Sequence, residues 1–117
     1  MKRGDIVTVD FPYSDGVQSK FRPAVVVQND RYNSTWKKTV IAMVTGNVSR
    51  RNDPAHLFVD PATDLETGLN GPSLVSCVNL YTIDQAAILR KRGQLPTTLL
   101  SRLDQCLIEA LGITESL

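Results

Sequence analysis

Residues 20–30 decide the fold, and they read Lys-Phe-Arg-Pro-Ala-Val-Val-Val-Gln-Asn-Asp. Residues 24–27 are an unbroken apolar run dominated by valine, and such a run predicts a strand buried on both faces. Proline has no N–H, so Pro23 suits the first residue of a strand and keeps the residue before it extended. Arg22 is therefore expected to be a cation on stiff backbone at the mouth of a buried strand. We expect the functional site there.

Further strand patterns surround this run, and one amphipathic helix closes the chain. Apolar residues recur at three- and four-residue spacing from Thr97 or Thr98 onward, and Gly112 is placed as the C-cap. Strands in this number with a single helix predict a mainly β fold, a small coiled antiparallel barrel with the C-terminal helix packed on it, in one domain spanning 1–117. The strands are expected at residues 5–11, 22–28, 39–44, 56–59, 73–83 and 89–95, with a polar loop at 12–21 and single helical turns within 29–38 and 84–88.

Composition excludes several classes of protein. The formal net charge of the 117 residues is +1, so the chain lacks the overall basic character of many nucleic-acid binders, although basic residues cluster locally. No apolar run approaches the ~20 residues that span a bilayer, and the N-terminus has no secretory pattern, so no membrane partner is expected. Cys77 and Cys106 lie far apart in apolar surroundings and are read as reduced core residues. The expected compartment is the cytoplasm.

Most familiar catalytic chemistry has no residues to carry it. The sequence has one histidine, His56, so a two-histidine acid–base mechanism is excluded. His56 lies in a strand pattern and is expected to have no chemical role. The cysteines and histidine do not form a metal-binding set, and no nucleotide-binding motif occurs, so no metal and no cofactor are expected. Polar residues at strand ends remain. An arginine with a hydroxyl neighbour can hold a phosphodiester and stabilise the charge that builds on its oxygens, without metal, if an RNA 2′-OH is the nucleophile. The polar residues at strand ends are Arg22, Gln28, Thr45, Asn47, Asn79 and Thr82.

Several motifs follow one another along nearly the whole chain. They are Lys2-Arg3-Gly4-Asp5-Ile6-Val7, then residues 22–30, Val44-Thr45, Gly68-Leu69 with Ser73, Tyr81-Thr82-Ile83-Asp84 and Gly93-Gln94-Leu95. In this order the motifs resemble the MazF/PemK family of toxin endoribonucleases. The resemblance implies an SH3-like barrel, a homodimer and metal-independent, sequence-selective cleavage of single-stranded mRNA. It also implies attack by the 2′-OH, products with 2′,3′-cyclic phosphate and 5′-OH ends, and a cognate antitoxin that blocks the RNA groove.

The resemblance also assigns residues. Arg22 and Thr45 would be the catalytic pair, with Arg22 clamping the phosphate and relaying a proton to the leaving 5′-oxygen, and Thr45 bonding a nonbridging oxygen. A guanidinium rarely gives up its proton, so Arg22 is a poor general base. Tyr13, Phe21 and Trp36 are candidates for stacking on bases or for simple packing. The residues expected to bind RNA are Tyr13, Gln18, Lys20, Phe21, Gln28, Asn47 and Asn79.

Two departures and two rival functions stay open. Val17 stands where the family loop has glutamate, and Val78 stands where an acidic residue often precedes the base-reading position. Both positions concern sequence choice, so the recognition sequence does not transfer. The rivals are a gyrase-poisoning toxin of the same fold and a non-catalytic binding homologue. Retention of both Arg22 and Thr45 favours the ribonuclease.

Overall fold

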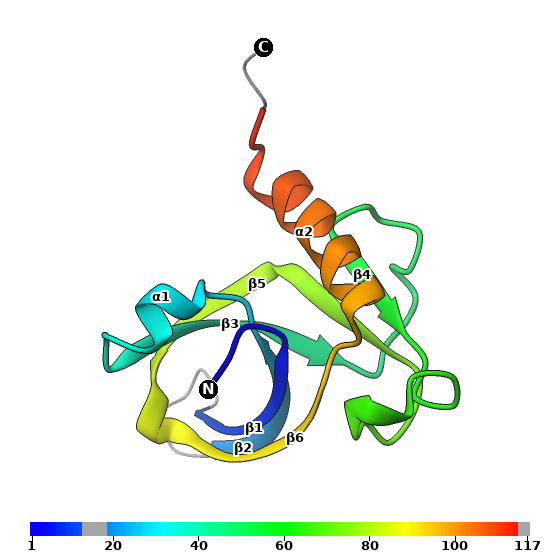
Figure 1. The fold of residues 1–117 in the computed structure, drawn as a ribbon. Coiled ribbons are helices and arrows are strands. Elements are labelled where there is room, and N and C mark those ends of the chain that lie inside the picture. The colour runs from blue at the N-terminus through cyan, green and yellow to red at the C-terminus, as the bar shows by residue number, and fades with distance from the viewer. Residues whose placement is uncertain (13–18, 115–117) are drawn as a thin grey trace.

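The computed structural model describes residues 1–12 and 19–114, and in these the chain forms one six-stranded antiparallel sheet in the order β4-β5-β3-β2-β1-β6. The sheet curls strongly, so that β1, β2, β3, β5 and β6 surround a common interior while α2 stands outside it (Figure 1). The predicted class, mainly β with a C-terminal helix, is confirmed, although the edge strands β4 and β6 do not pair to close the ladder of the described strands. The strands are β1 (Asp5–Pro12), β2 (Ser19–Val26), β3 (Lys38–Thr45), β4 (His56–Val59), β5 (Ser73–Asp84) and β6 (Ile88–Gln94); the helices are α1 (Asp30–Asn33), η1 (Leu65–Thr67), η2 (Gln85–Ala87) and α2 (Thr97–Leu111).

Two hydrophobic cores lie on opposite faces of this sheet, and the run at residues 24–27 contributes to both. The first, which we name the helix core, takes Val25 and Val27 together with the inward face of α2. The second, the inner core, takes Ala24 and Val26. The prediction that this run is buried on both faces is therefore confirmed. The inner core consists of Val7, Val9, Ala24, Val26, Ile41 and Met43; the helix core consists of Ile6, Val25, Val27, Ala42, Val44, Leu57, Val59, Val75, Cys77, Leu95, Leu99, Leu103 and Cys106.

The start of β2 corrects one expectation, because the strand begins at Ser19 and Arg22 lies within it. β1 reaches Pro12 and pairs with β2 back to Ser19, so the loop predicted at 12–21 is shortened from both sides. β3 pairs with β2 only at residues 24–26. The backbone N–H of Val27 donates to the carbonyl of Val40 on the β3 side. Backbone nitrogens an even number of residues apart point to the same side of a strand, so the nitrogen of Pro23 also faces β3. Pro23 thus falls beyond the end of the β2–β3 ladder, where no N–H is needed.

β5 carries an irregularity that shapes the site. Met43 of β3 pairs with Ser76, but the adjacent Ala42 pairs with Leu80, so residues 77–79 have no partner on β3. Cys77 turns its N–H to the carbonyl of Ala55 instead, at 3.0 Å. Bulges of this kind re-aim side chains. The one in β5 separates the buried Cys77 from the exposed Asn79.

Helix α2 behaves as predicted. It starts at Thr97 and ends at Leu111, and the C-cap Gly112 has a φ of 66°, the left-handed conformation that glycine adopts readily at a C-cap. Its buried face packs on β4 and β5, and Cys77 and Cys106 are both free and buried, as expected. None of the described helices has the length and apolar character needed to cross a membrane.

Candidate functional site

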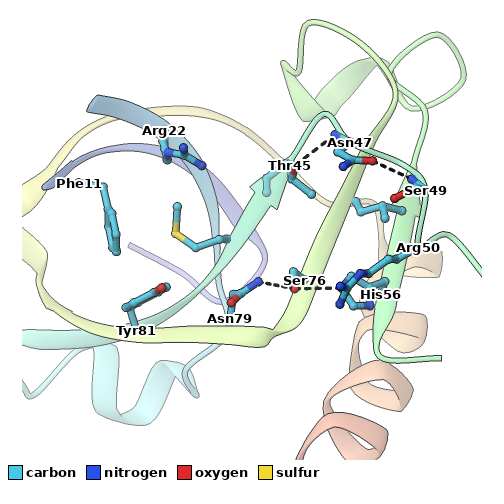
Figure 2. Close-up of a pocket in the computed structure, with 13 residues that line it drawn as sticks. Phe11, Arg22, Thr45, Asn47, Ser49, Arg50, His56, Ser76, Asn79 and Tyr81 are labelled. Carbon is cyan, nitrogen blue, oxygen red and sulfur yellow. Dashed lines mark hydrogen bonds between the residues drawn. The ribbon is translucent and has the colours of Figure 1, made fainter. Parts of the chain in front are cut away.

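A cleft of about 500 Å³ opens where β2, β3 and the bulge of β5 meet, and four residues predicted from the sequence line it. These four are Arg22, Thr45, Asn47 and Asn79, which come from segments far apart in the chain and face a common space (Figure 2). The register explains the convergence, because the paired strands bring the end of β3 beside β5 while β2 lies on the other side of β3. The full lining is Phe11, Arg22, Met43, Val44, Thr45, Asn47, Ser49, Arg50, His56, Leu74, Ser76, Asn79 and Tyr81.

The end of β3 fixes the orientation of the Thr45 hydroxyl. The backbone N–H of Asn47 donates to Thr45 Oγ1 at 3.1 Å, and the backbone N–H of Ser49 donates to Asn47 Oδ1 at 3.0 Å. A hydroxyl that already accepts one hydrogen bond can still donate its own hydrogen. Thr45 is therefore suited to donate into the cleft, while the carbonyl of the Asn47 side chain holds the turn that follows the strand.

The electrostatic character of the cleft is cationic. Arg22 and Arg50 both line it, and none of its lining residues among the described part of the chain is a carboxylate. Fork-shaped guanidinium groups recognise phosphate oxygens well, and their charge is felt more strongly in a concave site. The neighbouring Arg51 lies elsewhere, 4.0 Å from the centre of the Phe58 ring. Within residues 1–12 and 19–114, no group of His, Cys, Asp and Glu side chains is arranged to hold a metal ion.

A chain of polar contacts runs along the wall of the cleft from β4 to the bulge. Asn79 Nδ2 donates to Ser76 Oγ at 2.9 Å, and Ser76 Oγ lies 3.1 Å from His56 Nε2 (Figure 2). On the far side of the ring, His56 Nδ1 lies 3.3 Å from Asp53 Oδ1, without the alignment of a good hydrogen bond. The backbone N–H of Ala55 and then His56 itself hold the pKa of Asp53 below its usual value. His56 is in a strand, as predicted, but it also lines the cleft.

In the described part of the chain, the aromatic side chains that line the cleft are two that the sequence analysis did not single out. Phe11 and Tyr81 line it and pack edge to face, with ring centres 4.6 Å apart. Phe21 is 67% exposed and does not line the cleft. Trp36 packs against Tyr32 beside α1, away from the cleft residues. Tyr81 and Phe11 are therefore the aromatic groups that the described lining presents to the cleft.

Of the other predicted binding residues, only the side chain of Gln28 is described, and it lies outside this cluster. The Gln28 side chain does not line the cleft: it donates to Asn33 Oδ1 at 2.9 Å and to the Lys38 carbonyl at 3.0 Å, so it supports the turn around α1. Lys20 pairs with Phe11 in the β1–β2 ladder, and its side chain is outside the described set. Tyr13, Val17 and Gln18 also lie outside the described residues.

Several cleft residues were missed from the sequence, chiefly Arg50, His56 and Ser76. Arg50 had one signal, its place in a basic pair. His56 and Ser76 carried none that pattern reading uses, because they meet only through the β4–β5 register, in which they are direct partners. Residues twenty apart in the chain reveal such a contact only when strand pairing is known.

Both the sequence and the fold of this chain match those of known proteins. Residues 2–111 match the family described as PemK-like, MazF-like toxin of type II toxin-antitoxin system. Endoribonuclease MazF2 of Mycobacterium bovis is 30% identical over 115 residues, covering 97% of this chain and 98% of that protein. Endoribonuclease MazF6 of Mycobacterium tuberculosis is equally similar.

Solved structures agree on the fold. An endoribonuclease from a Mycobacterial species, solved in complex with its cognate antitoxin, has a TM-score of 0.77 at 20% identity and covers 99% of both chains. The MazE-MazF complex (Form-III) from Deinococcus radiodurans has a TM-score of 0.76 at 17% identity, covering 97% of this chain and 98% of that one.

Proposed function

This chain belongs to the PemK-like, MazF-like family of type II toxin–antitoxin toxins, and from that premise we propose that it is the toxin of such a pair and a metal-independent, sequence-selective endoribonuclease. The substrate is single-stranded RNA, above all mRNA. The observation that carries the proposal is the meeting of Arg22 and Thr45 in one cationic cleft whose described lining has no carboxylate. A phosphodiester is the group that such a lining attracts.

The proposed reaction is an internal transfer at phosphorus. The ribose 2′-oxygen attacks the adjacent phosphate, the bond to the 5′-oxygen breaks, and the proton of the 2′-OH ends on the leaving 5′-oxygen. The products are a 2′,3′-cyclic phosphate and a 5′-OH, and no water is consumed. Negative charge builds on the nonbridging oxygens as attack proceeds. Arg22 and the donating hydroxyl of Thr45 stabilise that charge where it develops.

The remaining lining residues position the RNA. Arg50 supplies a second cation for a neighbouring phosphate, and Tyr81 and Phe11 offer ring surface to an unpaired base. Asn79 presents an amide to a base edge. Sequence selectivity then comes from the wall of the cleft, while the reaction comes from Arg22 and Thr45.

The proposal includes partners. Relatives of this fold are described in complex with an antitoxin, and we propose a cognate antitoxin that covers the same cleft. We also propose a homodimer, since exposed apolar side chains remain at Leu89 on β6 and Leu111 on α2. The activity is proposed to operate in the cytoplasm, where mRNA is translated.

Cleavage of a long RNA in excess EDTA tests the reaction. The expected result is discrete fragments whose upstream ends carry a cyclic phosphate and whose downstream ends accept phosphate from a kinase, which requires a 5′-OH. The Arg22→Ala protein, purified in parallel, controls for contaminating nuclease. Intact RNA, or cleavage that EDTA abolishes, would overturn the proposal and favour the gyrase-poisoning or non-catalytic alternatives.

A further inference from the structure

The polar chain along the cleft wall has a defined direction, because its far end faces an obligate acceptor. The Asp53 carboxylate can only accept, and its Oδ1 lies 3.3 Å from His56 Nδ1, a close approach that favours the tautomer with a hydrogen on Nδ1 over one that turns a lone pair toward the carboxylate, although the contact is not aligned as a hydrogen bond. In that tautomer Nε2 is an acceptor, and the Ser76 hydroxyl is the donor across their 3.1 Å contact. Ser76 Oγ consequently accepts from Asn79 Nδ2, 2.9 Å away.

This arrangement is not a nucleophilic Ser-His-Asp site. Ser76 is 2% exposed, and its oxygen already accepts a hydrogen bond from Asn79. A nucleophilic serine has to present its oxygen to the substrate. What reaches the cleft is the other end of the chain, the exposed carboxamide of Asn79 (Figure 2).

We propose that His56 and Ser76 are positioning residues that hold the Asn79 carboxamide with Nδ2 toward the wall and Oδ1 toward the RNA. The inference rests on the proposed function and adds a specificity rule to it. We place the acceptor opposite the substituent on purine C6 or pyrimidine C4. Adenine and cytosine carry an amino group there and are selected, whereas guanine and uracil carry a carbonyl oxygen at the same position and are disfavoured. Rotation of the amide by a half turn would reverse the preference.

The position of the amide in β5 supports a reading role. The bulge at residues 77–79 frees Asn79 from the β3 ladder, so the backbone alone does not dictate which atom of the amide faces the cleft. The contact with Ser76 supplies that missing constraint. Tyr81, two residues further on, lines the same cleft and can hold the base against which the amide is read.

Cleavage-site sequencing on a randomised RNA library tests the rule. Wild-type protein is expected to show one position restricted to adenine or cytosine, with roughly ten- to one-hundred-fold preference over guanine and uracil. Ser76→Ala should erase the preference at that position and leave the others unchanged. Ser73→Ala is the matched control, because Ser73 is a buried serine on the same strand that bonds Gly71 and does not line the cleft.

Two histidine variants separate positioning from simple packing. His56→Gln keeps an acceptor within reach of Ser76 and should retain the preference. His56→Phe keeps a ring of similar size without the acceptor and should lose it. Thermal unfolding of both proteins verifies that they fold, so that equal preference in the two folded variants would overturn the proposal.

A double-mutant cycle supplies the remaining test and does not depend on the buried positions alone. Asn79→Leu should abolish the preference, and adding Ser76→Ala to it should change nothing further, since the serine acts only through Asn79. Additive losses would overturn the positioning role. A protein that cuts RNA with no amino-base preference contradicts only this inference, whereas a protein that cuts no RNA contradicts the proposed function itself.

Discussion

The two cores on either face of the sheet have different neighbours. The helix core is sealed by α2, which places Leu99, Leu103 and Cys106 over β4 and β5. The inner core ends in the cleft, where Met43 is both a core residue and part of the lining. The same strands serve both, since alternate residues of β2 and β3 point to opposite faces. The larger of the two cores thus lies on the face that α2 covers, and the proposed chemistry on the face that the curled sheet leaves open.

Arg22→Ala should show the largest difference between its effect on cleavage and its effect on stability. Loss of the guanidinium from the cleft is expected to reduce the cleavage rate by about 10²- to 10³-fold, because it removes a charged donor from the developing phosphorane. The free energy of unfolding should change by about 1 kcal/mol or less, since Arg22 belongs to neither core. Single-turnover cleavage and urea unfolding measure the two effects. Arg22→Lys keeps the charge but loses the fork and should fall between the two; full activity of Arg22→Ala would refute the assignment.

Leu103→Ala should have the opposite profile. Leu103 is a fully buried residue on the inward face of α2, and its truncation leaves a cavity that costs about 2–5 kcal/mol. Urea unfolding followed by circular dichroism measures the loss. Cleavage per folded molecule at low temperature should stay near the wild-type rate. Leu100→Ala, a half-buried position of the same helix, is the control and should cost less; an equal cost at both positions would argue against the helix core as described.

Thr45→Val tests the neutral partner of Arg22. Valine matches the shape of threonine but removes the hydroxyl, so the N–H of Asn47 also loses its acceptor. We expect a roughly ten- to one-hundred-fold slower cleavage step, smaller than for Arg22 because a neutral donor stabilises charge less. Thr45→Ser restores the hydroxyl and should recover most of the rate. Quench-flow or gel-based single-turnover assays decide this, and a valine variant as fast as wild type would remove Thr45 from the mechanism.

The buried thiols give the smallest effect, and it lies entirely in the helix core. Burial raises the pKa of Cys77 to about 12, whereas an unfolded thiol ionises near pH 8.5–9. The stability that this shift contributes is full below the unfolded pKa and is lost as pH rises toward the folded one. We expect a loss of about 1 kcal/mol between pH 8 and pH 9.5. Urea unfolding across that range should show a shallower loss in Cys77→Ala; an unchanged slope would contradict it.

Local patterns predicted the elements well because their causes are local. The valine run, the spacing of Leu99 and Leu103 and the glycine at 112 each specify a strand, a helix or a cap from neighbouring residues alone. The boundaries of β2 were less predictable. Whether Ser19 and Arg22 join a strand depends on how far β1 extends beside them, which is a tertiary property.

The candidate site divides in the same way. The sequence alone could identify four of the cleft residues, because they are polar and lie at the ends of strand patterns: Arg22, Thr45, Asn47 and Asn79. The resemblance to a family supported this choice. Gln28 met the same criterion and yet bonds Asn33 and Lys38, because α1 folds back beside it. His56 and Ser76 could not be predicted, since each is an ordinary strand residue until the β4–β5 register pairs them.

By itself the sequence determined a mainly β domain with a closing helix and membership of a toxin family, and it supplied a set of polar candidates for a site. These follow from side-chain chemistry and short-range periodicity, which are properties of the chain before it folds. Only the tertiary structure decided which polar side chains share the cleft and which way the Asn79 amide faces. Both depend on contacts between strands distant in sequence, and above all on the bulge in β5, whose register shift exists only once β3 and β5 have paired.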